Sequence, residues 1–189
     1  MTRIIAGSLG GRRIETPPGS DTRPTSDRVR ESLFARLDSL GMLADSTVLD
    51  LFAGSGALGL EAISRGATRA VFVERAGKAA QVVKKNIRAL DVADSCSVQV
   101  RAAQPAAEAL AGSDERFDLI FADPPYPLGE SELAQLLETA AGLLKDDASL
   151  LVIERSARSP QPQLPHSLSV YAKSLHGETA LWLVERSGE

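Results

Sequence analysis

The chain of 189 residues has few of the side chains that build metal centres and disulfides. It contains one cysteine, Cys96, and two well-separated histidines, His166 and His176. One thiol cannot form an intrachain disulfide, and isolated histidines do not make a ligand set. Cys96 lies in an expected strand, so we interpret it as a small core residue rather than a nucleophile. The sequence therefore predicts no metal site and no cysteine-based catalysis.

Long apolar runs are also missing. No stretch approaches the ~20 residues that a membrane helix needs, and residues 1–14 hold basic positions and paired glycines where a signal peptide would need an apolar core. We therefore expect a cytoplasmic protein with no membrane contact. The length suffices for one self-sufficient core, and we expect a monomer.

The charge is small in total but uneven along the chain. The net charge is −4, yet residues 1–30 carry six arginines against three acidic residues, a local charge of +3 that leaves −7 for the rest. An arginine cluster on an acidic body is typical of an anion-binding arm. The alternative interpretation is an ordinary solvated terminus.

Apolar strands alternate with amphipathic helices from residue 47 onward. The expected strands are 47–52, 70–74, 95–100, 117–122 and 150–154, and the expected helices are one after the turn at 54–56, 76–90, a short alanine-rich segment and 131–144. Repeated β-α units predict a mostly parallel sheet with helices on both faces. Residues 168–174 and 179–186 alternate around His176 and Gly177, which predicts a terminal antiparallel hairpin that closes the sheet.

The N-terminal segment departs from this pattern. Residues 3–6 and 12–15 flank a glycine-rich turn, which predicts a β-hairpin. Residues 16–24 contain three prolines and predict a hinge, after which a capped helix with one apolar stripe begins. We therefore expect a hairpin arm, 1–22, and a main domain, 23–189.

A glycine-rich segment, DLFAGSGALG (50–59), ends the first strand of the main domain and opens its first helix. Glycines there let a nucleotide cofactor lie against the backbone, and Glu74, at the end of the next strand, is placed to accept hydrogen bonds from ribose hydroxyls. The same glycines spell the dinucleotide fingerprint, so S-adenosylmethionine and a nicotinamide cofactor are both candidates. Asp50 favours S-adenosylmethionine, because its carboxylate can bind an ammonium group but would repel a pyrophosphate.

A second motif follows the buried strand 117–122 and consists of Asp123, Pro124, Pro125 and Tyr126. Each proline fixes its own φ, restrains the residue before it and lacks a backbone donor. The motif therefore offers a carboxylate, a backbone carbonyl and an aromatic ring face. These groups suit the capture of an exocyclic amine on a planar base, although a tight strand-to-loop turn would use the same residues.

Three segments resemble those of the Rossmann-like class I S-adenosylmethionine-dependent amino-methyltransferases. DLFAGSGALGLEA (50–62), VFVE (71–74) and DPPY (123–126) resemble the glycine loop, the ribose acid and the catalytic ledge of that class. The ledge is shared with DNA adenine and protein glutamine methyltransferases, so it indicates the chemistry rather than the substrate.

The N-terminal segments resemble a narrower family. RIIAG (3–7), RPT (23–25), RVRE (28–31) and LF (33–34) are similar to those of the RsmD family, which methylates N2 of one guanine in bacterial 16S ribosomal RNA. The resemblance covers nearly the whole chain. It implies a seven-stranded sheet, a hairpin arm on RNA, direct in-line methyl transfer and a substrate presented by an assembling 30S particle.

The resemblance also implies roles for individual residues. The catalytic residues would be Asp123, Pro124, Pro125 and Tyr126. S-adenosyl-L-methionine would contact Thr25, Arg28, Asp50, Phe52, Ala53, Gly54, Ser55, Gly56, Glu74, Arg75, Ala102 and Ala103. RNA would contact Arg3, Arg12, Arg13, Arg23 and Arg30. One departure is that residues 101–103 lack the Asp that often binds adenine, which leaves backbone groups, apolar contacts or Gln104 for that task.

Several alternatives stay open at this point. An adenine-N6 methyltransferase would share the ledge, although the chain holds no separate domain to read duplex DNA. A nicotinamide-dependent oxidoreductase would share the glycines, and a non-catalytic RNA-binding protein could retain the fold. Pyrimidine C5 methylation is disfavoured, because it needs a cysteine nucleophile near the ledge.

Overall fold

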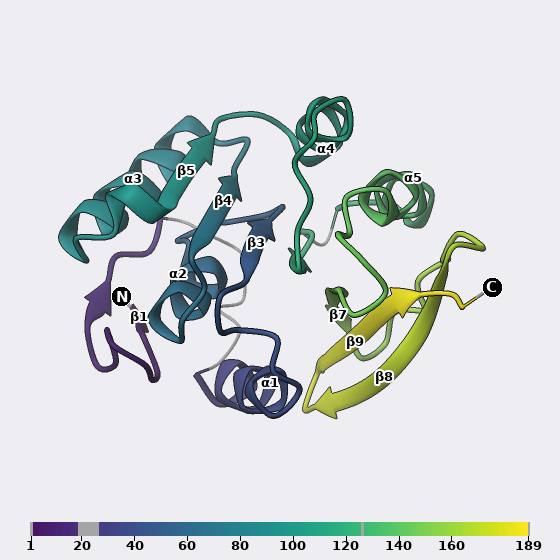
Figure 1. The fold of residues 1–189 in the computed structure, drawn as a ribbon, viewed down its shortest axis with the longest axis horizontal. Coiled ribbons are helices and arrows are strands. Elements are labelled where there is room, and N and C mark those ends of the chain that lie inside the picture. The colour runs from purple at the N-terminus through teal and green to yellow at the C-terminus, as the bar shows by residue number, and fades with distance from the viewer. Residues whose placement is uncertain (1, 19–26, 126, 189) are drawn as a thin grey trace.

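The computed structural model describes residues 2–18, 27–125 and 127–188, and a seven-stranded sheet lies at its centre (Figure 1). The strands are β3 (Thr47–Asp50), β4 (Arg69–Val73), β5 (Cys96–Gln99), β6 (Leu119–Ala122), β7 (Leu150–Ser156), β8 (Leu168–His176) and β9 (Thr179–Arg186). Their order is β5-β4-β3-β6-β7-β9-β8, and β9 runs antiparallel to both β7 and β8, whereas the remaining pairs are parallel. The predicted mostly parallel sheet and its C-terminal antiparallel hairpin are confirmed.

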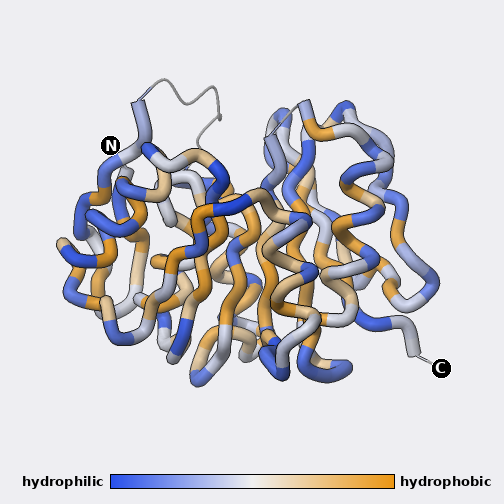
Figure 2. The backbone as a smooth tube through the Cα atoms, turned by 90° about the horizontal axis from the view of Figure 1, so that it is seen from above, coloured by the Kyte–Doolittle hydropathy of each residue, from blue (hydrophilic) through white to orange (hydrophobic). Residues whose placement is uncertain are grey.

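Helices cover both faces of this sheet. They are α1 (Asp27–Ser39), α2 (Ala57–Ser64), α3 (Gly77–Ala89), α4 (Ala103–Ala111) and α5 (Glu130–Ala141), with a short 3₁₀ turn at Ala93–Ser95. Successive side chains of a strand point to opposite faces. Val48 therefore joins the core beneath α1, α2 and α3, while Leu49 joins the core beneath α4 and α5. Hydrophobic residues run through the middle of the molecule and hydrophilic ones gather in its outer turns (Figure 2).

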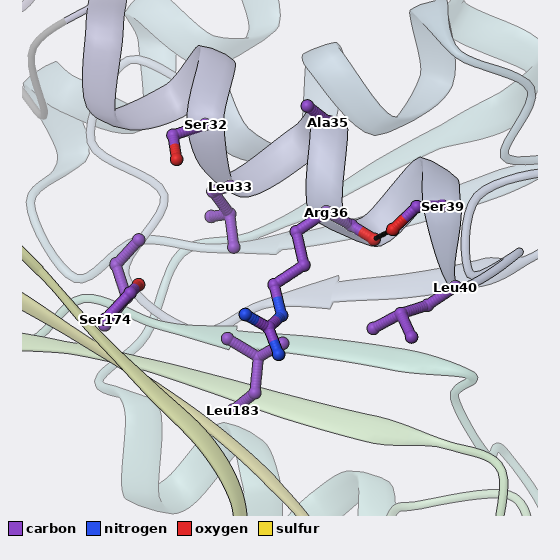
Figure 3. Close-up of a pocket in the computed structure, with 9 residues that line it drawn as sticks. Ser32, Leu33, Ala35, Arg36, Ser39, Leu40, Ser174 and Leu183 are labelled. Atoms are coloured by element: carbon purple, nitrogen blue, oxygen red, sulfur yellow. Dashed lines mark hydrogen bonds between the residues drawn. The ribbon is translucent and has the colours of Figure 1, made fainter.

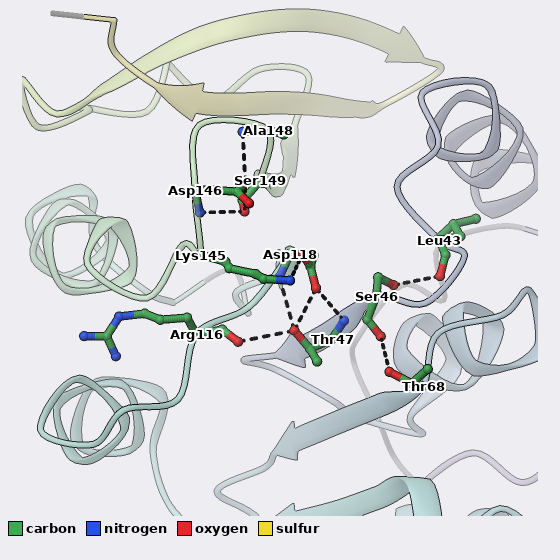
Figure 4. A network of polar contacts seen from close by, with 10 residues as sticks. All are labelled: Leu43, Ser46, Thr47, Thr68, Arg116, Asp118, Lys145, Asp146, Ala148 and Ser149. Atoms are coloured by element: carbon green, nitrogen blue, oxygen red, sulfur yellow. Dashed lines mark hydrogen bonds and ion pairs between the residues drawn. The ribbon is translucent and has the colours of Figure 1, made fainter.

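A polar network fixes the edge of the sheet where the parallel strands begin (Figure 4). Thr47 donates from its backbone nitrogen and its hydroxyl to Asp118 Oδ2, at 2.8 and 2.9 Å, and Lys145 Nζ lies 3.0 Å from Asp118 Oδ1. Partial burial raises the pKa of Asp118, but the hydrogen bonds from Thr47 and Lys145 outweigh it and leave that pKa below its usual value. The network aligns the starts of β3 and β6 and so helps to set where both strands end.

The N-terminal hairpin is present but shorter than predicted. Strand β1 (Thr2–Arg3) pairs antiparallel with β2 (Arg13–Ile14). Ile4 N still donates across the hairpin to the carbonyl of Arg12, at 2.9 Å, but the N–H groups of Ile5 and Ala6 donate to the carboxylate of Glu61 on α2, at 2.7 and 3.0 Å. Because those groups bind α2, the strand ends earlier than its sequence pattern indicates.

The hairpin packs on the main domain. Ile4 and Ile14 are 0% and 2% exposed and belong to the same core as α1, α2 and α3. The expected boundary between residues 22 and 23 falls in the range 19–26, outside the described residues. No helix in the described part of the chain is long and apolar enough to cross a membrane.

Candidate functional site

The carboxyl ends of parallel strands meet at one edge of a sheet, and the predicted site residues lie there. Strand β3 ends at Asp50 and continues into the loop 51–56, β4 is followed by Glu74, and β6 is followed by Asp123. Leu51 N donates to the carbonyl of Phe121 at 3.0 Å, which holds the start of the loop against the end of β6. The structure thus brings the glycine loop and the ledge side by side.

The glycine loop is a tight turn that only small residues allow. Gly56 has φ 85°, in the left-handed region, and its N–H donates to the carbonyl of Ala53 at 2.7 Å. A Cβ on Gly59 would lie 2.4 Å from a ring carbon of Phe72, so α2 can approach β4 only with glycine there. Two of the three glycines that favoured a nucleotide site therefore also shape the local backbone.

Glu74 holds the loop from the neighbouring strand. Its Oε2 accepts from Gly54 N at 2.9 Å and its Oε1 accepts from Ala76 N at 2.8 Å. Each carboxylate oxygen has a second lone pair, so the group can still accept from a ribose hydroxyl. The adjacent Arg75 is exposed, while Phe52 and Ser55 are half-buried and Ala53 is 7% exposed.

Asp50 is a buried acid with one oxygen that lacks a partner. It is 1% exposed, and its Oδ2 accepts from Gly59 N at 3.4 Å, whereas its Oδ1 has no hydrogen bond. Burial raises the pKa of Asp50 to about 7, and the charge of Glu74 acts in the same direction. A buried carboxylate of this kind is stabilised by a nearby cation, which fits the ammonium group of an amino-acid-bearing cofactor.

The ledge places a second acid near the first. Asp123 is half-buried, and burial together with the charges of Glu154 and Asp50 holds its pKa well above the usual value. Pro124 is buried, and the carbonyl of Pro125 accepts from Leu128 N at 3.0 Å, which closes the turn after the ledge. Tyr126, the predicted stacking residue, lies outside the described residues.

Glu154 is a site residue that the sequence reasoning missed. It follows Ile153, which pairs with Ala122, so β7 delivers its carboxylate beside Asp123. The available signal was an acidic residue at the end of an apolar strand, but its proximity to the ledge depends on β7 being the neighbour of β6.

The start of α4 is the predicted adenine end of the cofactor site. Ala102 is exposed and Ala103, the first residue of α4, is 9% exposed. Gln104 Nε2 donates to Glu108 at 2.8 Å and to Thr139 of α5 at 3.0 Å. The NH2 group of Gln104 is thus committed to Glu108 and to the packing of α4 on α5, whereas its Oε1 is buried without a hydrogen-bond partner. Backbone groups, apolar contacts and Gln104 Oε1 therefore all stay candidates for adenine.

The predicted RNA-contacting arginines have different environments. Arg3, Arg12 and Arg13 are exposed on the hairpin, and Arg12 Nη2 also donates to the carbonyl of Ala89 at the end of α3, at 2.6 Å. Arg23, like the predicted cofactor residue Thr25, lies outside the described residues.

Arg30 does not fit the prediction that it contacts RNA. It is 1% exposed, and its Nη2 donates to the Thr2 hydroxyl, the Arg3 carbonyl and Asp27 Oδ1, at 2.8, 2.9 and 2.8 Å. Strand β1 covers the side of α1 on which Arg30 lies. Arg30 therefore fastens the hairpin to α1 instead of offering its guanidinium to a phosphate.

Two hollows lie away from the glycine loop. Arg28 lines one of about 550 Å³ between the hairpin and α1, together with Arg3 and Glu31. The other, of about 450 Å³, lies between α1 and the β8–β9 hairpin, and Arg36 extends into it (Figure 3). Neither hollow is lined by a residue of the loop 51–56 or by Asp123.

Cys96 opens β5, at the end of the strand opposite to the cofactor loop. Burial raises the pKa of its thiol to about 12. A thiol with that pKa is not a nucleophile near neutral pH. Among the described residues no group of three or more His, Cys, Asp or Glu side chains could hold a metal ion.

The strand order, the glycine loop and the acidic ledge together define a Rossmann-like fold of the class I methyltransferase type. The structure of an S-adenosylmethionine-dependent methyltransferase from Neisseria gonorrhoeae superposes with a TM-score of 0.65 at 20% identity, over 82% of this chain and 68% of that one. A likeness at that identity shows the fold and no more.

More similar proteins identify the family. The family described as "Conserved hypothetical protein 95" matches residues 2–185, and the chain belongs to it. The Escherichia coli K12 protein "Ribosomal RNA small subunit methyltransferase D" is 34% identical over 192 residues, which cover 99% of this chain and 91% of that protein. The structure of a hypothetical protein from Thermus thermophilus gives a TM-score of 0.83 at 31% identity, over 98% of this chain and 99% of that one. The resemblance to the RsmD family is confirmed.

Proposed function

We propose that this protein uses S-adenosyl-L-methionine to methylate the exocyclic N2 amine of a guanine in small-subunit ribosomal RNA. The names of its relatives support ribosomal RNA as the substrate class. The observation that carries the chemistry is the juxtaposition of two acids: the buried Asp50, whose Oδ1 makes no hydrogen bond, and the half-buried Asp123, at the neighbouring strand end. One can hold the ammonium group of the methyl donor while the other holds the amine that accepts the methyl group.

The residues present fit the cofactor. Asp50 would pair with the ammonium group of the cofactor, and Glu74 would accept hydrogen bonds from its ribose hydroxyls. The cofactor would lie against the backbone of the turn at 53–56. Phe52, Arg75, Ala102 and Ala103 would border the ribose and adenine. When bound, the cofactor supplies a methyl group on a positively charged sulfur.

The ledge would orient the amine for direct in-line transfer. The Asp123 carboxylate and the Pro124 carbonyl would each accept a hydrogen bond from one N–H of the amine, which directs the nitrogen lone pair out of the plane of the base. Positioning of this kind can supply several kcal/mol of the barrier, up to ~7–11 in ideal cases. Tyr126 would stack on the base, a contact worth ~1–3 kcal/mol.

Proton removal would follow methyl transfer rather than precede it. A carboxylate cannot deprotonate a neutral aryl amine, but the methylated amine is cationic and acidic. The raised pKa of Asp123 makes its carboxylate a better acceptor for that proton than an ordinary aspartate. The pairing of Asp50 with an ammonium group removes one of the charges that keep Asp123 protonated, so cofactor binding would favour the ionised form of Asp123.

The substrate would reach this site as an unpaired or flipped base. The arm, 1–22, would hold the surrounding RNA through Arg3, Arg12 and Arg13, and Arg23, directly after the arm, would add a fourth contact. The domain 23–189 would carry the chemistry. We propose that the substrate is an assembling 30S particle and that the enzyme acts as a monomer.

The ledge can be tested by replacing Asp123. We expect Asp123→Ala to lower methyl transfer to 30S subunits that lack the modification by a factor of about 10³ or more, because it removes one of the two acceptors that hold the amine. Binding of S-adenosylmethionine should persist, as measured by titration calorimetry. Asp114→Ala, in the exposed loop before the same strand, is the control and should retain wild-type activity. Full activity of Asp123→Ala would exclude the ledge from the mechanism.

A further inference from the structure

One buried side chain links the hairpin arm to the cofactor loop. Asn86 lies on α3 and is 2% exposed. Its Oδ1 accepts from Glu15 N at 2.8 Å, and its Nδ2 donates to the carbonyls of Glu15 and Ser55, both at 2.9 Å. Glu15 follows β2 in the hairpin, and Ser55 lies in the glycine loop. The amide thus spends both of its donors and its acceptor on these two segments.

The contact with Ser55 controls the orientation of one peptide in the loop. The Ser55 carbonyl and the Gly56 N–H belong to the same planar unit, so fixing one fixes the other. Asn86 holds the carbonyl on one side while the Gly56 N–H donates to Ala53 on the other, at 2.7 Å. Rotation of this peptide would break both hydrogen bonds and reshape the turn on which the cofactor would lie.

The contact with Glu15 resembles one step of a β-ladder. The side-chain amide pairs with both the N–H and the carbonyl of the same residue, as a neighbouring strand would. A displacement of the returning strand of the hairpin would therefore pull on Asn86 directly. Other contacts reach the hairpin without reaching the loop. Ser64, at the end of α2, donates to the Ala6 carbonyl and accepts from Leu9 N at 2.9 Å.

We propose that Asn86 is a positioning residue that couples the RNA-holding arm to the cofactor loop, so that RNA and cofactor bind cooperatively. This inference rests on the proposed function of both segments. RNA bound to the arm fixes Glu15, and Asn86 transmits that restraint to the Ser55–Gly56 peptide. The bound cofactor restrains the same peptide from the other side and so favours the arm position that holds RNA. By thermodynamic reciprocity the two effects are equal in free energy.

The coupling can be measured with S-adenosylhomocysteine as the cofactor probe and purified 30S subunits lacking the modification as the RNA probe. The quantity of interest is the ratio of the S-adenosylhomocysteine dissociation constants without and with saturating 30S. For the wild type we expect a ratio of about 5 or more. Asn86→Ala should bring the ratio to about 1 and weaken S-adenosylhomocysteine binding even without 30S.

Two further variants separate coupling from loss of stability. Asn86→Asp keeps the acceptor for Glu15 N but loses both donors, so it should also bring the ratio of dissociation constants to about 1. This variant replaces Asn86→Ala in the experiment if Asn86→Ala does not fold. Ser64→Ala loosens the hairpin without touching the loop. It should weaken 30S binding while leaving the ratio at its wild-type value. A general loss of packing would lower the melting temperature of the Asn86 variants and of Ser64→Ala alike. It would not bring the ratio to about 1 in the Asn86 variants while leaving it unchanged in Ser64→Ala.

The outcomes are distinguishable. A wild-type ratio of 1 with measurable binding of S-adenosylhomocysteine and 30S would overturn the coupling and leave the proposed function standing. A wild-type ratio preserved in folded Asn86→Ala or Asn86→Asp would assign the coupling to another path and overturn the role of Asn86. Failure of the wild type to bind S-adenosylhomocysteine would overturn the proposed function and the coupling with it.

Discussion

At the scale of single residues, the site depends on acids whose burial disfavours their charged forms. The backbone N–H groups of Gly59 and Phe52 act on the Asp50 carboxylate, but its Oδ1 makes no well-formed hydrogen bond, and Asp123 is near both Asp50 and Glu154. Such an arrangement costs stability in the ligand-free protein and is compensated when a cation arrives. Acids arranged for stability behave differently, since Asp118 has its hydrogen bonds satisfied and its pKa lowered.

The raised pKa of Asp50 makes stability depend on pH. Its value of about 7 in the folded protein lies above the unfolded reference of ~3.9, so its contribution is fully present below pH ~4 and is lost as pH rises toward 7. We expect the free energy of unfolding of the cofactor-free protein to fall over this window, by up to about 4 kcal/mol from Asp50.

Urea unfolding at pH 5 and pH 8 measures this effect. Asp50→Asn should flatten the decline and be more stable than the wild type at pH 8, because the amide cannot ionise. The exposed substitution Asp114→Asn is the control and should leave the decline unchanged. If Asp50→Asn declines as steeply as the wild type, Asp50 is not the group that titrates.

At the scale of elements, the hairpin is built into the fold while its arginines stay exposed. Four side chains bind its backbone, those of Glu61, Ser64, Asn86 and Arg30. Arg3, Arg12 and Arg13 are exposed, although Arg12 also bonds to the carbonyl of Ala89. An element anchored in this way can present charge to an RNA backbone at a fixed position relative to the ledge.

Removal of the hairpin arginines tests this role. We expect the double substitution Arg12→Ala, Arg13→Ala to weaken 30S binding and to reduce the slope of log affinity against log salt by up to ~2, since each phosphate contact contributes ~0.9. Filter binding over a range of salt concentrations gives the slope. The affinity for S-adenosylhomocysteine without RNA should not change.

Arg116→Ala is the matched control. Arg116 is exposed and lies just before β6 begins, at the edge where the parallel strands start rather than at the edge of the ledge. It should bind 30S with the wild-type salt slope. A double variant with the wild-type slope and affinity would show that the hairpin makes no RNA contact through these two residues.

The positions of the strands and helices were predicted well from sequence wherever apolar periodicity and the placement of glycines mark their bounds. The strands and helices from residue 47 onward were expected within a few residues, because the strands are continuous apolar runs and the helices carry an apolar face at helical spacing. The hairpin strands were overestimated, since Glu61 captures the N–H groups of Ile5 and Ala6 and its position follows only from the packing of α2. Arg30 was expected to contact RNA but is buried under β1, and the sequence does not show which segment covers that side of α1.

At the scale of the whole molecule, the residues of the proposed chemistry lie at the edge where the parallel strands end. A polar network that fixes the strands lies at the edge where they start. The network around Asp118 aligns the strand starts, and the loop, Glu74 and Asp123 follow the strand ends. Asp50, Glu74 and the ledge could be predicted from sequence because each lies at the end of an apolar strand or directly after it. Glu154 and Asn86 could not, because their importance depends on which strands and helices become neighbours.

The central claim is that an amine held by the ledge receives a methyl group from a donor held by the glycine loop. The most direct measurement incubates the purified protein with labelled S-adenosylmethionine and 30S subunits from cells lacking it, followed by mass spectrometry of the labelled nucleoside. The account predicts N2-methylguanosine in the small-subunit RNA. Label in N6-methyladenosine, or no transfer by a protein that binds both partners, would contradict it.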